Sequence, residues 1–475
     1  MQHIGTRKIA ASGLWLTASF ALAKILQLLA QIFLARLLTP KDFGLWGIVL
    51  IMTTLSALFK DVAIATVLVH RGLDDKKLVD AVYSLGVNIS VAMFMIQVLS
   101  GFPLAQFFHE PLVLPLSATA ALIFLISAGA GSHGAVLQRQ MKFRDLAIAD
   151  SGAGFARFAG AVICAAFGGG VWSFVVAEIA MATVDALLKR WLSKYQFTYH
   201  LIPDQSALQE VKGYVSSLIG IDLAVYVNTN GDNLIIGKLL GPQSLGYYNL
   251  AYQLAMLPAF ALSQINRINF SVLSQRDQEG QKAYLSQILE IYALLYAPIY
   301  GVAFVVAPWI IPSIYGSQWN PVVKLFQIIL IFAYARGFMS ILGVALIAAN
   351  KADVNAAINW TLIPLSLPAY FFGAKFGGSL GVAMAVALVM GVGATIWFWL
   401  VTCRAAGWNI GVLIKPIFLP TVTVVVTVVA VQANLSYIYL QPVFIFCVYG
   451  IAMSVFSLGR IKRMFILVIK RSLSK

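Results

Sequence analysis

Apolar residues recur along the chain in runs of about twenty, and short connections containing Pro, Gly, Lys or Arg separate the runs. A helix of about 20 residues, rising 1.5 Å per residue, spans the roughly 30 Å of hydrocarbon in a bilayer. The pattern therefore predicts fourteen membrane-spanning helices. Their predicted ranges are residues 12–35, 43–67, 81–107, 112–137, 146–167, 171–190, 213–237, 244–267, 283–312, 322–349, 354–375, 379–403, 411–431 and 437–458.

The composition agrees with an all-α polytopic membrane protein. Hydrophobic residues make up 60% of the 475 residues and charged residues only 11%, too few to cover a water-soluble domain. The basic start and the Ala-Leu-Ala sequence at residues 21–23 resemble a cleaved signal peptide. However, the apolar run continues to Leu38 and Lys24 directly follows the apparent cleavage site. We therefore expect this segment to be retained as the first span.

The net charge of +15 is distributed unevenly among the predicted connections. With the amino terminus in the cytoplasm, the inner connections and tails carry 24 of the 33 Lys and Arg residues and the outer connections carry 5. This bias follows the positive-inside rule and predicts that both termini are cytoplasmic. The basic excess thus indicates a membrane surface as the partner, and no nucleic acid.

Residue spacing supports no metal, disulfide or nucleotide site. Cys164, Cys403 and Cys447 lie in separate apolar runs, and the five histidines are dispersed. The sequence GAGSHG at 129–134 matches a dinucleotide-binding pattern, but no strand precedes it, so close helix packing explains it better. Without a P-loop sequence, we expect no cofactor. Transport would then be coupled to a proton or sodium gradient, to the membrane potential or to consumption of the product.

Two segments in the two halves of the chain match at nearly the same offset. ARLLTPKDFGLW at 35–46 aligns with GKLLGPQSLGYY at 237–248, 202 residues later, and shares two Leu, a Pro and a Gly. A second match has an offset of 209 residues. It aligns MKFRD (141–145) with NKADV (350–354), and FGGGVWS (167–173) with FGGSLGV (376–382). Because six predicted spans separate the copies, both have the same orientation, which predicts two parallel six-helix lobes.

The predicted organisation follows from this duplication. An N-terminal lobe (1–190) is joined by a cytoplasmic linker (191–212) to a C-terminal lobe (213–404), followed by an extra transmembrane helix pair (405–458) and a basic cytoplasmic tail (459–475). In folds with such repeats, substrate sites lie between the halves.

One predicted helix, 213–237, carries a polar stripe. Asp222, Tyr226, Thr229 and Asn233 are spaced i, i+4, i+7 and i+11, which places them on one helix face, and Asn230 and Asp232 lie nearby. The corresponding positions 202 residues earlier are Phe20, Lys24, Gln27 and Gln31. A charge in the middle of a membrane costs about 2.5–3.5 kcal/mol on insertion scales, so both stripes are predicted to face a hydrated cavity. A dry polar network between the lobes is the alternative.

Other charges within predicted spans have different expected roles. Arg336, and Lys60 with Asp61, are further candidates for the cavity. Arg157 is instead predicted to form an ion pair inside its lobe, with Glu178 or Asp185 on the adjacent antiparallel helix.

The pattern D-x-L-I-I-G-x-L-L-G-x-x-x-L-G-Y-Y, which begins at Asp232, is more specific. Together with the two six-helix halves and the final helix pair, it resembles the polysaccharide-exporter branch of the multidrug/oligosaccharidyl-lipid/polysaccharide (MOP) superfamily. The resemblance covers nearly the whole chain and is to Wzx-type flippases that export colanic acid and related polymers. It implies a monomer with V-shaped lobes in the bacterial inner membrane. It also implies transfer of undecaprenyl-pyrophosphate-linked oligosaccharide to the periplasmic leaflet, alongside other polysaccharide-assembly proteins.

Such a substrate needs cations for its pyrophosphate and amides, hydroxyls and aromatic faces for its sugars. Lys24 and Arg336 suit the first role. The residues that suit the second role are Gln27, Gln31, Tyr226, Thr229, Asn230 and Asn233. Asp61, Asp222 and Asp232 are candidates for ion coupling. The lipid tail is expected to stay in the bilayer, near the last two helices.

Two other functions remain open. An ion-coupled multidrug antiporter of the same superfamily would share the duplicated fold but should favour carboxylates for cationic drugs, which Lys24 and Arg336 oppose. A membrane polysaccharide polymerase or ligase would need acids or bases in a sizeable outer loop. The predicted outer loops are short and contain only Asp42 and Glu110 as acids. We therefore predict a transporter, not an enzyme.

The predicted orientation can be tested by thiol labelling. The turns at 168–171 and 432–436 are predicted to be periplasmic, and the segment 194–210 and the C-terminal tail cytoplasmic. In intact cells, a membrane-impermeant reagent should label a single cysteine at position 434 but not one at position 200. Labelling at 200 but not at 434 would reverse the orientation.

Overall fold

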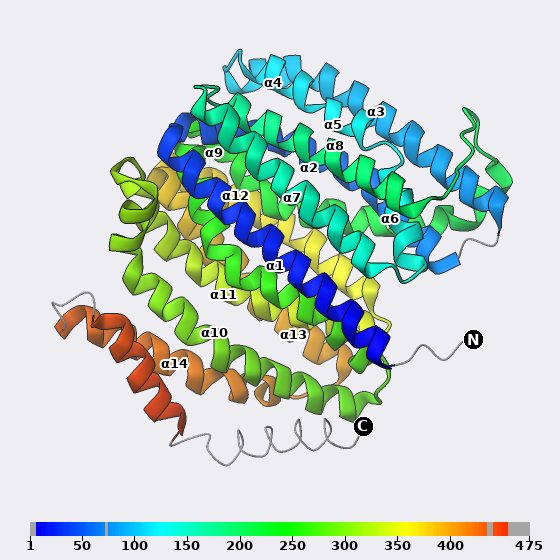
Figure 1. Ribbon diagram of the computed structural model, residues 1–475. Coiled ribbons are helices and arrows are strands. Elements are labelled where there is room, and N and C mark those ends of the chain that lie inside the picture. The colour runs from blue at the N-terminus through cyan, green and yellow to red at the C-terminus, as the bar shows by residue number, and fades with distance from the viewer. Residues whose placement is uncertain (1–5, 72–74, 435–439, 455–475) are drawn as a thin grey trace. The chain divides into compact units, whose positions relative to one another are not determined.

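The structure is a computed structural model that describes residues 6–71, 75–434 and 440–454 (Figure 1). Every regular element in these residues is helical, which confirms the predicted all-α class. The helices are α1 (Thr6–Leu37), α2 (Pro40–Arg71), α3 (Lys76–Phe108), α4 (Val113–Ala120), α5 (Leu122–Ile126), α6 (Ala130–Arg139), α7 (Phe143–Ala166), α8 (Trp172–Ser193), α9 (Gln205–Ser274), α10 (Gln278–Tyr315), α11 (Asn320–Ala348), α12 (Ala352–Ala385), α13 (Ala394–Ala406), α14 (Ile410–Asn434) and a last helix, Gln441–Ser454, with a 3₁₀ turn η1 (Ser317–Trp319) and a π-helical segment η2 (Val386–Gly393).

Several helices are long and apolar enough to cross a membrane, so the chain is a multi-pass membrane protein. Within the described residues there are seven, or eight if the bent pair Val113–Ile126 and Ala130–Arg139 forms one span. The seven are Pro40–Phe59, Lys76–Phe108, Phe143–Ala166, Gln278–Tyr315, Ser317–Ala348, Ala352–Ala406 and Ile414–Ala433. The predicted total of fourteen spans stays a prediction.

Two glycines reverse the chain inside what would otherwise be continuous helices. Gly241 in α9 has φ 80° and ψ 173°, and Gly378 in α12 has φ 58° and ψ −147°. Residues eight apart in a straight helix are about 12 Å apart, yet a Cβ built on Gly373 would lie 2.6 Å from the carbonyl oxygen of Gly381. Glycine adopts such backbone angles without the strain of a Cβ. Each reversal falls between two predicted spans.

The predicted helix 112–137 differs from the structure, which has three short helices there. The segment Val113–Ile126, which contains α4 and α5, and the helix α6 are bent by 41° across a short break, and Gly129 in this break has φ 76°. Because a bend of this kind leaves the apolar run uninterrupted, hydrophobicity alone predicted one straight helix.

The chain divides into two compact units, Met1–Asn249 and Leu250–Lys475. We call them the N-terminal unit and the C-terminal unit. The division falls inside α9, so residues up to Asn249 pack with the first unit although the sequence repeat assigns them to the second lobe. The lobe boundaries at 190 and 213 stay a prediction.

In the N-terminal unit, α7 lies between α1 and α8 (Figure 1). Small residues bring these helices close. A Cβ on Gly160 would lie 3.2 Å from that of Ala180 on α8, and one on Gly154 would lie 3.7 Å from that of Ala23 on α1. In lipid, where apolar contact alone does not drive helix association, close backbone approach of this kind holds helices together.

An extended segment covers one end of α3. We call residues 195–201 the strap. Three side chains at i, i+4 and i+8 on α3 bind its backbone. These bonds are Thr198 N to Asp80 Oδ1 (3.0 Å), His200 N to Ser84 Oγ (3.0 Å) and Asn88 Nδ2 to Leu201 O (3.0 Å). Phe197 of the strap stacks on Tyr83, with ring centroids 4.5 Å apart. The strap is therefore a fixed part of the N-terminal unit.

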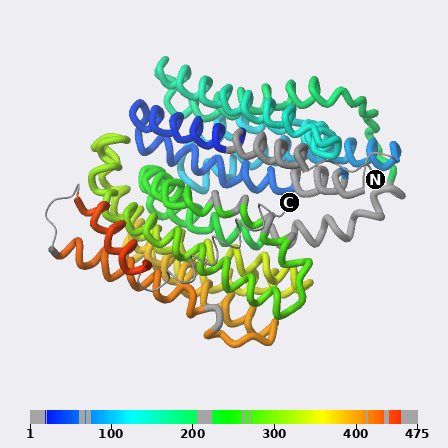
Figure 2. Tube along the Cα trace, turned by 60° about the horizontal axis from the view of Figure 1, so that its bottom comes forward, coloured from blue at the N-terminus to red at the C-terminus, as the bar shows by residue number. Residues whose placement is uncertain are grey.

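In the C-terminal unit, α14 and the last helix lie beside α10 (Figure 1, Figure 2). The hydroxyl of Tyr449 donates to the carbonyl of Leu294 on α10 (3.0 Å), and Tyr334 on α11 shares a hydrogen bond with Thr421 on α14 (2.8 Å). Val431 and Ile445 are buried together against α10. The helices that follow the sequence repeat thus pack as an integral part of this unit.

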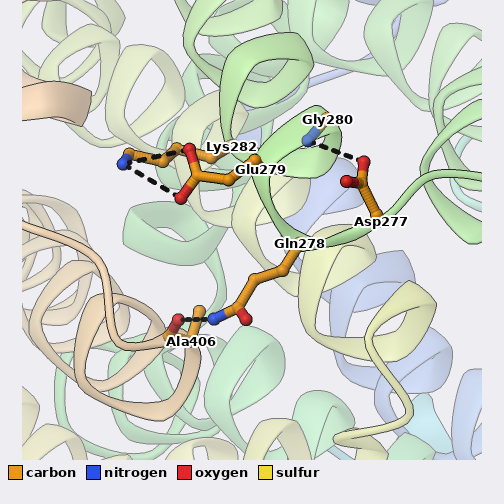
Figure 3. A network of polar contacts seen from close by, with 6 residues as sticks. All are labelled: Asp277, Gln278, Glu279, Gly280, Lys282 and Ala406. Carbon is orange, nitrogen blue, oxygen red and sulfur yellow. Dashed lines mark hydrogen bonds and ion pairs between the residues drawn. The ribbon is translucent and has the colours of Figure 1, made fainter.

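Three connections meet at one end of the C-terminal unit. The Gln278 side chain, in the first turn of α10, donates to the carbonyl of Ala406 at the end of α13 (Figure 3). Lys351 donates to the neighbouring carbonyl of Ala405. Asp277 caps α10 by accepting from the N–H of Gly280 at 3.1 Å. Side chains thereby satisfy the terminal carbonyls of α13 that have no partner within the helix.

Adjacent glycines test the reversal in α12. Gly378→Ala should lower the free energy of unfolding by about 1–3 kcal/mol, because its backbone angles are strained for a residue with a Cβ. Gly377→Ala is the matched control, since a Cβ there meets no atom within 4 Å. It should be neutral or stabilise by up to about 1 kcal/mol. Thermal unfolding in the same detergent compares the variants, and equal melting temperatures would contradict the strained reversal.

Candidate functional site

A cavity of about 480 Å³ lies within the helix bundle of the N-terminal unit. Helices α1, α7 and α8 provide most of its walls, and α2, α5 and α6 close the remainder. Six charged side chains line it, three acids and three bases. They are Lys24, Asp150, Arg157, Glu178, Asp185 and Lys189. Such walls favour water or a polar ligand over lipid.

Helix α1 contributes two of the predicted site residues to this cavity. The ammonium of Lys24 donates to Oε1 of Gln27 at 3.0 Å, as expected for residues three apart on one helix face. Both side chains line the cavity. The close approach of Ala23 to Gly154 on α7 places this turn of α1 at the cavity wall.

Arg157 forms the ion pair that the sequence predicts. Its guanidinium lies 2.5 Å from Oε1 of Glu178, and the two side chains are 34% and 15% exposed. Replacing a buried ion pair by apolar packing is often neutral or stabilising. The pair is therefore better explained by the polar cavity beside it than by a requirement for stability.

Lys189 joins two carboxylates at the same cavity. Its ammonium lies 2.7 Å from Asp185 and 3.5 Å from Asp150. Sequence reasoning did not assign Asp150 or Lys189 to a site, although signals were present. Asp150 lies seven residues before Arg157, on the same helix face, and Asp185 and Lys189 have the i, i+4 spacing of an ion pair.

The polar stripe on α9 is bonded largely to backbone. The hydroxyl of Tyr226 donates to the carbonyl of Ile51 on α2. Thr229 Oγ1 donates to the carbonyl of Val225 (2.8 Å), and Asn230 Nδ2 donates to that of Tyr226 (3.1 Å). These side chains and Asn233 are not among the lining residues of the cavity. Lys24 and Gln27 thus line the cavity together with α7 and α8, whereas the described side chains of this stripe are not among its lining residues.

Asp232 is buried, with 2% of its surface exposed. Its carboxylate accepts from the hydroxyl of Tyr248 (2.5 Å) and from the N–H of Asn233 (2.8 Å). The Asp at the start of the family-like motif is therefore bonded to the Tyr at its end, across the reversal at Gly241. The side-chain oxygen of Asn233 is buried without a hydrogen-bond partner in the described part of the chain.

The other predicted site residues are more dispersed. Gln31 is buried on α1, one turn beyond Gln27, and does not line the cavity. Arg336 is half-buried on α11 of the C-terminal unit. The side chains of Asp61 and Asp222 lie outside the described part of the structure.

The chain matches one family model and several curated relatives. Residues 33–324 match the model described as "Polysaccharide biosynthesis protein". The lipopolysaccharide biosynthesis protein WzxC of Escherichia coli (strain K12) is 23% identical over 402 residues, which cover 83% of this chain and 81% of WzxC. The teichuronic acid biosynthesis protein TuaB of Bacillus subtilis (strain 168) is 22% identical over 410 residues, 83% and 82% of the two chains.

Solved structures share the fold. The lipid II flippase MurJ in an inward closed conformation superposes with a TM-score of 0.76 at 13% identity, covering 94% of this chain and 99% of that one. An inward-facing multidrug resistance MATE family transporter of the MOP superfamily gives 0.67 at 15% identity, covering 83% and 96%. The architecture is therefore MurJ- and MATE-like.

The Arg157–Glu178 pair can be tested by neutralising its members in turn. Arg157→Gln should lower the free energy of unfolding by about 1–2 kcal/mol, less than the roughly 3–5 kcal/mol of a fully buried pair, because the Glu178 side chain that remains is partly exposed. The double variant with Glu178→Gln should regain part of this loss, since it leaves no unpaired charge. The exposed Lys142→Gln serves as control. If the losses of unfolding free energy in the two single variants simply add up in the double variant, Arg157 and Glu178 are not coupled and the prediction is wrong.

Proposed function

Since the chain belongs to the polysaccharide biosynthesis protein family, we propose that it flips undecaprenyl-pyrophosphate-linked oligosaccharide from the cytoplasmic to the periplasmic leaflet. The chain is a Wzx-like multi-pass transporter of the MOP superfamily, not an enzyme. The proposed location is a bacterial inner membrane with both termini in the cytoplasm. The proposed role is surface polysaccharide biosynthesis by alternating access, with the protein acting as a monomer.

The charged cavity of the N-terminal unit is the observation that carries this proposal. A lipid-linked oligosaccharide has a charged, hydroxyl-rich head that cannot cross hydrocarbon unaided. The cavity offers cationic and amide groups on the inside of a bundle whose outer faces are apolar. The names of WzxC and TuaB, which refer to lipopolysaccharide biosynthesis and to teichuronic acid biosynthesis, point in the same direction.

Lys24 is the proposed contact for the pyrophosphate. At an effective dielectric near 20, an ammonium about 4 Å from a phosphate charge gains roughly 4 kcal/mol before desolvation. Gln27 holds the Lys24 ammonium at 3.0 Å and provides an amide for hydrogen bonds to sugar hydroxyls. Arg336 is proposed as a second cation, and Gln31, Tyr226, Thr229, Asn230 and Asn233 as further sugar contacts.

The proposed organisation has fourteen spans. Twelve of them form two parallel six-helix lobes (1–190 and 213–404), which the linker 191–212 joins. The extra pair 405–458 and the tail 459–475 follow. The match between residues 35–46 and 237–248 supports the duplication. Energy would come from a proton or sodium gradient, and the proposed coupling residues are Asp61, Asp222 and Asp232.

A multidrug antiporter is the second candidate. Three carboxylates, Asp150, Glu178 and Asp185, line the cavity and could attract a cationic drug. The fold is also that of a MATE transporter. However, Arg157 or Lys189 pairs with each of these acids, which reduces their attraction for a cation. The lipid-linked oligosaccharide is therefore preferred.

Mass spectrometry of lipid-linked glycans in a deletion strain tests this function. We expect undecaprenyl-pyrophosphate-linked oligosaccharide to accumulate and the intact chain to clear it. Lys24→Ala should abolish clearance at normal protein abundance, and Lys24→Arg should retain part of it because the charge is kept. Lys77→Ala, at an exposed position, is the matched control and should clear normally.

Two outcomes would contradict the proposal. If the deletion strain accumulates no lipid-linked glycan but becomes sensitive to cationic drugs, the antiporter is correct. If Asp222→Asn restores abundance and clearance to the Lys24→Ala variant, Lys24 only neutralises an acid and does not bind phosphate.

A further inference from the structure

The motif that begins at Asp232 folds into a tight helical hairpin. We call residues 237–249 the hairpin. The chain reverses at Gly241, and a Cβ on Gly237 would lie 3.3 Å from the Leu245 side chain on the opposite arm. The hydrogen bond from the Tyr248 hydroxyl to the Asp232 carboxylate joins the two helical arms at the base of the hairpin. The motif thus specifies one local structure with two arms in close contact.

The hairpin packs against α2 through a reciprocal contact. A Cβ built on Gly44 would overlap the carbonyl oxygen of Pro242, and a Cβ built on Gly246 would overlap that of Pro40. Pro242 and Gly246 lie 202 residues after Pro40 and Gly44 and are their counterparts in the sequence repeat. A contact in which residue i touches j′ and j touches i′ is the signature of a two-fold relation. The repeated motif therefore packs against its own copy.

No side chain separates the two backbones at this contact. Both positions are glycine, and each faces a backbone carbonyl instead of a flexible group. Neither water nor a substrate fits between α2 and the hairpin at this point. The start of α2 and the hairpin both lie at the end of the bundle that the charge bias predicts to be periplasmic.

Beside this glycine contact, the hairpin also contacts the end of α3. Lys238 donates to the carbonyl of Phe107, and its ammonium lies 4.6 Å from the centre of the Phe107 ring. Lys41 at the start of α2 pairs with Glu110 beyond α3 at 3.0 Å, which joins α2 and α3 into one surface. Lys238 is exposed. Exposed contacts of this type are weak and can be broken without a large cost.

We propose that the hairpin is the outer gate of the transporter, closed in this structure by the reciprocal glycine contact. This inference rests on the proposed function in so far as it assumes a substrate that leaves at this end. Release requires the hairpin to separate from α2. The sequence Pro-x-x-x-Gly occurs in both repeats, at residues 40–44 and 242–246. In the closed gate, each of these two copies contacts the other. The alternative is a permanent joint that stays closed throughout the cycle.

A disulfide across the contact distinguishes the gate from the joint. A Cβ built on Gly47 lies 3.5 Å from Cγ of Asn249, the atom bonded to the Cβ of that residue. A disulfide joins two Cβ atoms about 3.5–4.5 Å apart, so cysteines at these two positions are near enough to be tested for a cross-link. The variant Gly47→Cys with Asn249→Cys is made in a chain in which Cys164, Cys403 and Cys447 are replaced by serine. Clearance of lipid-linked glycan is then compared in the oxidised and the reduced protein.

For a gate, the oxidised protein loses clearance and the reduced protein regains it. If the fully cross-linked protein clears glycan as well as the reduced one, the contact is a permanent joint and the proposal is wrong. If no disulfide forms in protein of normal abundance, the two elements do not meet as described, and the proposal is equally wrong. The single variants, Gly47→Cys and Asn249→Cys, control for each substitution.

A second measurement needs no substrate. Leu245 is fully buried, so a single cysteine there should resist a hydrophilic thiol reagent while the gate is closed. Gly44→Ala should force the backbones apart and increase the labelling rate. Gly377→Ala is the control, because a Cβ at Gly377 meets no atom within 4 Å and this residue does not line the cavity. Unchanged labelling with Gly44→Ala overturns the gate. If instead the labelling increases but no glycan is ever cleared, the gate stands and the proposed substrate is wrong.

Discussion

Polar groups in hydrocarbon must be satisfied by the protein or by enclosed water, because the bilayer core offers neither donors nor acceptors. This constraint accounts for much of the structure. In the N-terminal unit it gathers charges from α1, α7 and α8 around one cavity. Elsewhere it directs hydroxyls to their own helix, as when Thr53 donates to Val49 and Ser84 to Asp80. It also explains why Tyr226 reaches a backbone carbonyl on α2.

The same environment removes the hydrophobic drive for helices to associate, since lipid is as apolar as a leucine side chain. Close backbone contact replaces that drive, and glycine makes it possible. Gly160 permits it between α7 and α8, and Gly301 faces Val424 where α14 meets α10. Among the described residues, the contacts of Gly44 and Gly246 with backbone carbonyls are the tightest of this kind, and they join two copies of one sequence motif. Duplication therefore provides a matched pair of surfaces without a second sequence having to evolve.

Hydrophobic periodicity predicted the helical class and the positions of the reversals, because a run of apolar residues must form a helix in lipid. It did not predict the bend near Gly129, which leaves the apolar run unbroken. In the site, it predicted that Lys24 and Gln27 share a face and that Arg157 pairs within its unit, since both follow from spacing along a helix. It did not assign Asp150 or Lys189 to the cavity, because which helix faces meet is decided by tertiary packing. Asn230 and Thr229 stay proposed sugar contacts. In this structure their side chains donate to carbonyls of their own helix, and the polarity of the helix face does not predict that partner.

The strap has a consequence for engineering the protein. Connections between helices usually accept inserted residues, because their backbone polar groups are bound to water. In the strap these groups are bound to Asp80, Ser84 and Asn88 in a fixed register. One added residue would shift every following group to the opposite face of the extended chain. A fluorescent or affinity tag would therefore disturb this connection far more than its irregular conformation suggests.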